Sequence, residues 1–200
     1  MEVRKLRERE RAESEERFMA MKGGKGHTIA DIEALPEGER AELIDGELFR
    51  MDAPTTTHQS ILIELAFEIK LYIKKKNGLC KVLPAPYGVY IKKDRRNYVE
   101  PDISIICDKE KIDEKGCHGA PDWAIEIMSP SSLKMDCEQK VKLYREAGVR
   151  EYWIVDAERE AVMVYDFEHG KEAVQYTFTD RVKAGIFEEL YLNLSMMDIN

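Results

Sequence analysis

Two acidic residues lie in sequence surroundings where a carboxylate is expected to carry out chemistry. Asp102 follows Pro101 in the run YVEPDISIIC, and Glu126 interrupts WAIEIM, which is otherwise apolar. Because WAIEIM offers apolar side chains to both faces, it is typical of a strand buried on both sides. An antiparallel pair of these strands around loop 108–121 would place the two carboxylates opposite each other, with their stems about 5 Å apart. Two such carboxylates repel each other, and a divalent cation between them removes that cost.

The segment after Glu126 supplies a basic residue for the same place. A helix predicted over residues 133–147 advances by about 100° per residue, and one side of its wheel is apolar. That stripe contains Leu133, Cys137, Val141, Tyr144 and Ala147. Lys140 falls inside the stripe and Asp136 lies at its edge, whereas the other basic residues of the helix lie outside it. A lysine directed into an apolar face needs an acidic partner, which Glu126 on the preceding strand provides.

Both patterns also have an ordinary structural interpretation. The two carboxylates are equally compatible with one ion pair and one acid exposed at a sheet edge. Lys140 could extend its stem along the apolar surface and keep its ammonium group in water. Cys117 and His118 are zinc-type ligands side by side, but the sequence offers no second ligand pair at a suitable spacing, so zinc is not expected.

The rest of the pattern predicts the elements that position these side chains. A short helix is expected over residues 29–35, and AELIDGELFRM predicts a hairpin with a type I′ turn at Asp45-Gly46. A long helix over residues 57–76 carries apolar residues at helical spacing, has His58 in its first turn and ends in lysines.

The later segments are predicted to be mostly strands. They are CKVLPAP, YGVYI, NYVEPDISIIC, DWAIEIMS, REYWIVD, EAVMVYDF and EAVQYTFT. Residues 108–121 are expected to form a polar loop. Ser131 and Ser132 are expected to cap the second helix, which Gly148 ends. This order of helices and strands predicts an α/β (α+β) domain.

Composition narrows the class of protein. The chain has 200 residues, which fits one domain, and its net charge is −8. This balance argues against a nucleic-acid coat protein, because such proteins bind by neutralising phosphates with lysine and arginine. Residues 1–26 interleave acids with bases and end in glycines, which predicts a charged appendage before a domain at 27–200. With no membrane-length apolar run and no secretory signal, we expect a cytoplasmic protein without membrane contact, whose four cysteines are thiols.

Several motifs together resemble the Uma-two family of the PD-(D/E)XK nuclease superfamily. They are ELIDGEL, His58 at a helix start, PDISII, AIEIMSPSS, the D-x-x-x-K-x-x-x-Y series of Asp136, Lys140 and Tyr144, and GVREYWIVD. The resemblance covers about residues 28–195, and the combination of IEIMSPSS with GVREYWIVD is specific. Met128 stands where the superfamily has the lysine of E-x-K. In this family the lysine comes from the following helix instead, which matches Lys140.

The resemblance implies a restriction-endonuclease-like fold, with a mixed central β-sheet flanked by helices, and metal-assisted hydrolysis of phosphodiester bonds. Asp102, Glu126 and the main-chain carbonyl of Ile127 would hold Mg²⁺, for which Mn²⁺ substitutes. Lys140 would orient the attacking water or stabilise charge on the phosphate.

The resemblance also implies further site residues. Glu42 of ELIDGEL matches the acidic residue that the superfamily carries near its first helix, although Glu47 competes for that role. His58, Asp136 and Tyr144 are expected to support the site.

DNA is the expected substrate, although the catalytic set is also compatible with RNA. A homodimer is expected because two sites related by a two-fold axis cut both strands of a duplex most simply. The strands near 162–178 or the charged appendage would form its interface. A second hypothesis is a non-catalytic module that binds nucleic acid or protein and keeps the nuclease fold. Metal binding discriminates between the two, because only the enzyme requires it.

Overall fold

The computed structural model describes residues 26–128 and 135–199, which fall into two compact units. The first, the hairpin unit, comprises residues 26–52 and 94–99. The second, the sheet unit, comprises residues 53–93 and the described residues from 100 onward. Among the described residues, no helix combines the length and the apolar character needed to cross a membrane.

The hairpin unit contains α2 (Ile29–Glu33), β1 (Ala41–Ile44) and β2 (Glu47–Arg50). The strands β1 and β2 pair antiparallel. Asp45 and Gly46 between them have φ angles of 50° and 81°. Because a type I′ turn requires positive φ at both central residues, the predicted turn is confirmed. Leu43 and Tyr98 exchange two main-chain hydrogen bonds, which tie residues 94–99 to the hairpin.

The sheet unit holds most of the regular structure. Its helical segments are α3 (Thr56–Lys75), η1 (Lys109–Lys111), the π-helical η2 (Met135–Lys140), α4 (Val141–Ala147) and η3 (Leu194–Met196). Its strands are β3 (Lys81–Pro84), β4 (Val89–Tyr90), β5 (Ile103–Ile106), β6 (Ile112–Asp113), β7 (Gly116–His118), β8 (Trp123–Ile127), β9 (Glu151–Asp156), β10 (Ala161–Asp166), β11 (Val174–Thr177), β12 (Val182–Lys183) and β13 (Tyr191–Leu192).

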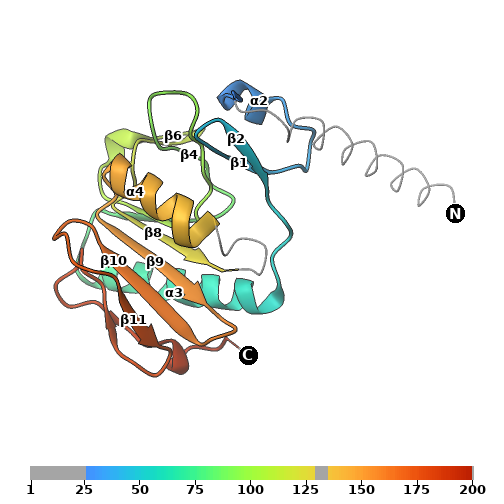
Figure 1. Cartoon of the computed structure of the whole chain (residues 1–200). Helices are drawn as coiled ribbons and strands as arrows, with labels where there is room; N and C mark the ends of the chain where they lie inside the picture. Colours follow the sequence, from blue (N-terminus) through green and yellow to red (C-terminus); the bar gives the residue numbers. More distant parts are fainter. Residues whose placement is uncertain (1–25, 129–134, 200) are drawn as a thin grey trace, which may run out of the picture. The chain divides into compact units, whose positions relative to one another are not determined.

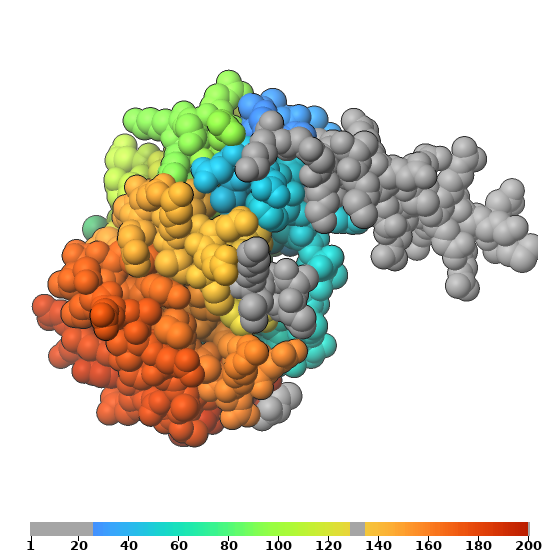
Figure 2. All heavy atoms as spheres, in the orientation of Figure 1, coloured from blue at the N-terminus to red at the C-terminus, as the bar shows by residue number. Residues whose placement is uncertain are grey.

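A six-stranded mixed sheet in the order β11-β10-β9-β8-β5-β3 forms the centre of this unit. Its strands β8 and β9 are parallel, and the other neighbours are antiparallel. The helix α3 covers one face of the sheet, and α4 lies on the opposite face (Figure 1). In the space-filling view, the gold atoms of η2 and α4 cover the sheet from the α4 side (Figure 2). Trp123 and Trp153 on the parallel strands pack in the core against each other, with ring centroids 4.8 Å apart.

The long helix α3 follows from its local sequence. The Thr55 hydroxyl accepts a hydrogen bond from the His58 N–H at 3.2 Å, which caps the first turn. Ile61, Leu65 and Ile69 recur at helical spacing and are fully buried against the sheet. Lysines occupy the last turn, where they interact favourably with the helix dipole.

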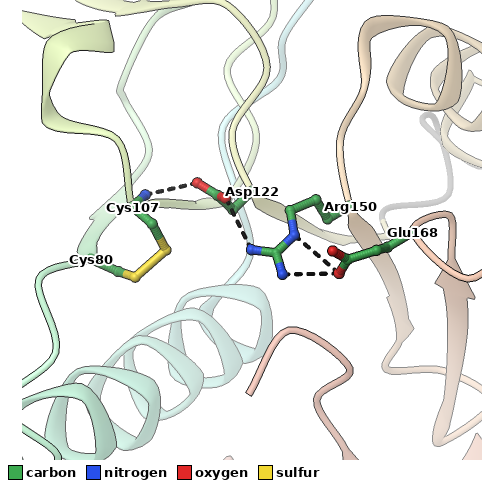
Figure 3. The surroundings of a disulfide bond; sticks show 5 residues. All are labelled: Cys80, Cys107, Asp122, Arg150 and Glu168. Carbon is green, nitrogen blue, oxygen red and sulfur yellow. Dashed lines mark hydrogen bonds and ion pairs between the residues drawn. A yellow bond between two sulfur atoms is a disulfide. The ribbon is translucent and has the colours of Figure 1, made fainter. Parts of the chain in front are cut away.

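A disulfide joins Cys80 to Cys107, so the expectation of four thiols is wrong. The two cysteines flank β3 and β5, and one further step of the Lys81–Ile106 register makes them cross-strand neighbours. Figure 3 shows Asp122 beside the disulfide, between Cys107 and Arg150. Asp122 accepts hydrogen bonds from the Cys107 N–H at 2.8 Å and from the Arg150 guanidinium at 3.2 Å. A sequence separation of 27 residues conceals this pairing, because only the strand register brings the sulfurs together.

The segment between β5 and β8 has more regular structure than its sequence predicts. Residues 108–121, expected to be a polar loop, contain η1, β6 and β7, and the last two form a small sheet with β4. The proposed helix caps Ser131 and Ser132, and residues 1–25 of the charged appendage, lie outside the described residues.

Candidate active site

The two carboxylates singled out by the sequence lie on neighbouring strands. The strands β5 and β8 pair antiparallel with Ile103 opposite Ile125, and one further step places Asp102 opposite Glu126. Asp102 Oδ2 accepts a hydrogen bond from the Ile127 N–H at 2.7 Å. The antiparallel pairing of the two strands is therefore confirmed, and that the two carboxylates face each other stays a prediction.

His58 contributes to this end of the sheet from the first turn of α3. Its Nε2 lies 3.1 Å from Asp102 Oδ2, and both side chains are mostly buried. Its Nδ1 atom is buried without a hydrogen-bond partner in the part of the chain that the structure describes. The histidine therefore fixes the orientation of the Asp102 carboxylate together with the Ile127 amide.

Glu126 accepts hydrogen bonds from two side chains of the η2–α4 segment. Lys140 Nζ and the Tyr144 hydroxyl each donate to Glu126 Oε1 at 2.8 Å. Lys140 Nζ also lies 3.4 Å from Asp136 Oδ1. The side chains of Lys140, Glu126 and Asp136 are only 3%, 5% and 2% exposed, so the ammonium lies between two carboxylates away from water. The predicted partnership of Lys140 with Glu126 is confirmed, and the snorkelling alternative is wrong.

The helix that carries Lys140 differs from the expected regular α-helix. Residues 135–140 are π-helical, with i→i+5 hydrogen bonding, before α4 begins at Val141. The wider turn rotates residues relative to an α-helical wheel. Cys137, expected in the buried stripe, is therefore exposed, while Asp136, expected at its edge, is buried. The π-helical turn thus brings Asp136 and Lys140 into the interior together.

Tyr152 is a neighbour of the site that the sequence does not single out. Its ring packs edge-on against that of Tyr144 at 4.8 Å, and its hydroxyl donates to the main-chain carbonyl of Asp136 at 3.2 Å. Burial, and then the nearby carboxylates of Asp136 and Glu126, raise the pKa of Tyr152 well above its usual value. The sequence signal that could have identified Tyr152 is its position in REYWIVD. Side chains of a strand alternate between its two faces, so every second residue of this run faces α4.

The other acidic candidates belong to the hairpin unit. Glu42 lies on β1 opposite Phe49, and its side chain is buried. Glu47 opens β2 and is half-buried. A catalytic role for either residue stays a prediction.

The oxygen-rich donor set suits a hard divalent cation. Both hydrogen bonds to Asp102 from described residues end on Oδ2, which leaves Oδ1 as a ligand atom. The N–H and C=O of one strand residue point to the same edge, so the Ile127 carbonyl faces the side on which Asp102 lies. Within residues 26–128 and 135–199, no three His, Cys, Asp or Glu side chains are grouped closely enough to hold a metal ion. An ion here would complete its shell with a carbonyl and water, which Mg²⁺ accepts.

Comparisons with known proteins agree with this architecture. Residues 29–195 match the model of the Uma2 family, described as "Putative restriction endonuclease". The crystal structure of a "putative nuclease belonging to DUF820" from Anabaena variabilis ATCC 29413 superposes with a TM-score of 0.70 at 21% identity. That superposition covers 85% of this chain and 96% of the other.

One relative found by sequence matches a shorter part of the chain. The "Uncharacterized protein slr1290" of Synechocystis sp. (strain ATCC 27184 / PCC 6803 / Kazusa) is 26% identical over 106 residues. The alignment spans 53% of this chain and 54% of the relative, so each protein matches over about half its length. The structural match confirms the expected restriction-endonuclease-like α+β fold, whose family usually implies a divalent metal. Since the family model spans most of the sequence, the chain belongs to the Uma2 family.

Proposed function

We propose that this chain is a metal-dependent nuclease that hydrolyses phosphodiester bonds in DNA. The observation that carries the proposal is that two groups of polar side chains meet consecutive residues of β8: Lys140 donates to Glu126, and the N–H of the next residue, Ile127, donates to Asp102. Burying an ammonium with its carboxylates costs desolvation free energy. Apolar residues of similar volume would stabilise a purely structural core at least as well. Membership of a family of restriction-endonuclease type supports the same conclusion.

In this proposal Asp102, Glu126 and the Ile127 carbonyl would hold Mg²⁺, with Mn²⁺ as a substitute. When bound, the ion lowers the pKa of a coordinated water and polarises the phosphate. The Ile127 amide and His58 fix the Asp102 carboxylate in its orientation. Lys140 holds Glu126, and the family motif assigns it the further role of orienting the attacking water or stabilising negative charge on the phosphate, for which its ammonium would have to move from its buried position.

The remaining predicted residues have supporting roles. Tyr144 shares Glu126 Oε1 with Lys140 and so limits the rotation of that carboxylate. Asp136 balances the buried ammonium. The family motif adds Glu42 as a candidate catalytic acid, which a Glu42→Gln variant tests by its cleavage rate.

The proposed enzyme works as a homodimer on duplex DNA. The same residues are compatible with cleavage of RNA, so both nucleic acids belong in the first substrate screen. Cleavage of RNA alone would replace the substrate in this proposal and leave the site unchanged.

The first test is a calorimetric titration of Mn²⁺ into the full chain and into an Asp102→Asn variant. A Glu158→Gln variant, which removes an exposed carboxylate outside the site, is the matched control. We expect saturable binding in wild type and control that is lost in Asp102→Asn, and Mn²⁺-dependent cleavage of plasmid DNA with the same pattern. Equal Mn²⁺ binding in all three proteins, with no cleavage, would contradict the nuclease and favour the non-catalytic binding module.

A further inference from the structure

The disulfide ties an edge strand to the interior of the sheet. Cys80 directly precedes β3, an outermost strand of the six-stranded sheet, and Cys107 directly follows β5. The four side chains of β3 are exposed or half-buried, whereas those of β5 are all buried. A strand with so little buried surface is weakly held by packing, because burial of apolar surface is the dominant favourable term in folding. The covalent bond at Cys80 is therefore a main anchor of β3.

The strand register places the two cysteines next to each other. The Ala85 N–H donates to the Asp102 carbonyl at 2.9 Å, so these two residues form a hydrogen-bonded pair at the other end of the ladder. Hydrogen-bonded and non-hydrogen-bonded pairs alternate along antiparallel strands, and Cys80 lies five residues before Ala85. The cysteines thus occupy a non-hydrogen-bonded pair, in which opposite side chains approach most closely. Whenever β3 is paired with β5, two thiols at this position can form the bond again.

The surroundings hold the two cysteines unequally (Figure 3). The Cys107 N–H donates to Asp122 Oδ2 at 2.8 Å, and the Arg150 guanidinium lies 3.2 Å from Asp122 Oδ1. Cys107 is therefore held on β5 independently of the disulfide. Residues 74–79, which lead from the end of α3 into Cys80, are all exposed. Cys80 and β3 are thus the parts that opening of the bond releases.

The disulfide is also accessible to thiols in solution. Cys80 and Cys107 are half-buried, and residues 77–79 and 108–110 beside them are exposed. Cys137 is a free thiol at the surface of the same chain. Exposed free thiols are typical of proteins kept under reducing conditions, where a disulfide is usually transient or redox-sensing. Exposed disulfides are also the ones that thiols reduce most readily.

We propose that Cys80–Cys107 is a reversible redox switch, opened by a low-molecular-weight thiol such as glutathione, that sets how firmly β3 pairs with β5. One glutathione thiolate attacks a sulfur of the disulfide, breaks the S–S bond and leaves a mixed disulfide and a cysteine thiolate. A second glutathione thiolate attacks the mixed disulfide, and oxidised glutathione leaves. Two electrons have then passed to the protein, and the two protons lost by the glutathione thiols end on the two cysteine sulfurs.

The switch goes beyond the proposed function, but its effect on the candidate metal site rests on that function. At the end of the ladder away from the disulfide, Ala85 holds the Asp102 carbonyl. His58, on the helix before β3, contacts the Asp102 side chain. Opening the disulfide frees the β3 side of this arrangement, so a candidate metal ligand loses part of its support. We expect the closed form to bind Mn²⁺ at least about fivefold more tightly, the lower end of typical couplings between sites.

Hydrogen–deuterium exchange on the full chain tests the switch. The protein is equilibrated in buffers with different ratios of reduced to oxidised glutathione, and alkylation followed by peptide mapping of a parallel sample gives the state of each cysteine. We expect the disulfide to open and re-form as the ratio changes. The amides of residues 81–85 should exchange at least about tenfold faster in the open form, because a weakly packed edge strand opens locally at low cost. Exchange within β9 and β10 should stay the same.

Two variants serve as controls. Cys137→Ser removes the exposed thiol and leaves the pair intact, so it should behave as wild type. Cys80→Ser/Cys107→Ser should show fast exchange of residues 81–85 in every buffer. The proposal would be overturned by a disulfide that stays closed in excess reduced glutathione, by equal exchange of residues 81–85 in both states, or by loss of the redox response in Cys137→Ser.

The Mn²⁺ affinity is compared between oxidised wild type and Cys80→Ser/Cys107→Ser, so that no reductant competes for the ion. Equal affinities would refute the coupling to Asp102. Absence of Mn²⁺ binding in both proteins would contradict the proposed nuclease site, while the exchange rates would still decide the switch.

Discussion

Replacing Lys140 by methionine should destabilise the protein strongly, because the substitution removes the ammonium that lies between two buried carboxylates. Lys140 Nζ lies 2.8 Å from Glu126 Oε1 and 3.4 Å from Asp136 Oδ1, and all three side chains are at most 5% exposed. Solvent therefore screens these interactions very little. Removing one partner of a buried ion pair typically costs about 3–5 kcal/mol, a large share of the roughly 5–15 kcal/mol that stabilises a domain.

The control variant neutralises the whole group at once, with Glu126→Gln, Asp136→Asn and Lys140→Met together. None of these three positions then carries a charge, and buried charged triads can often be replaced at little cost. We expect this triple variant to recover at least about 2 kcal/mol relative to Lys140→Met alone.

Urea unfolding in the presence of a chelator measures both variants without a contribution from bound metal. Trp123 and Trp153 are fully buried in the sheet unit, so their fluorescence reports its unfolding. With a slope of about 2 kcal/mol per molar, the midpoint of Lys140→Met should fall by about 2 M. A shift within about 0.5 kcal/mol of wild type, the scale of ordinary surface substitutions, would show that the ammonium does not compensate these carboxylates.

Three further predictions follow from other parts of the chain. Met128→Lys should leave the plasmid cleavage rate unchanged, because Lys140 already provides the ammonium; a faster reaction would contradict that role. Under oxidising conditions Cys80→Ser/Cys107→Ser should lower the unfolding free energy by about 3–4 kcal/mol, the chain-entropy value for a 27-residue separation. In excess reductant the variant and wild type should unfold together, and a difference that persists there would refute the disulfide as its cause. Burial raises the pKa of Cys117 to about 11, so a thiol reagent at pH 8 should label one cysteine of the native chain and two of the urea-unfolded, unreduced chain.

The local parts of the fold could be predicted because their signals are contained in short stretches of sequence. The apolar spacing and the terminal lysines of α3, and the Asp45-Gly46 turn, depend on neighbours within a few residues. The placement of Asp102 opposite Glu126 required only one assumption, that the strands on either side of loop 108–121 pair antiparallel.

The errors arose where distant or non-ideal geometry decides the outcome. A wheel of 100° per residue assumes an α-helix, so it placed Cys137 in the buried stripe and Asp136 at its edge. The π-helical turn reverses the burial of those two residues. Lys140 points inward in either kind of helix, because it lies near the centre of the inward face. No pattern within residues 135–147 distinguishes the two kinds of helix.

The sequence by itself determined which residue types are available and which face of each element they occupy, since both follow from local periodicity. Only the tertiary structure decided which of them meet. His58 reaches Asp102 across 44 residues, and Cys80 pairs with Cys107 through the strand register. Such contacts depend on how whole elements pack, because the free energy of packing belongs to the assembled sheet and helices and not to any one segment.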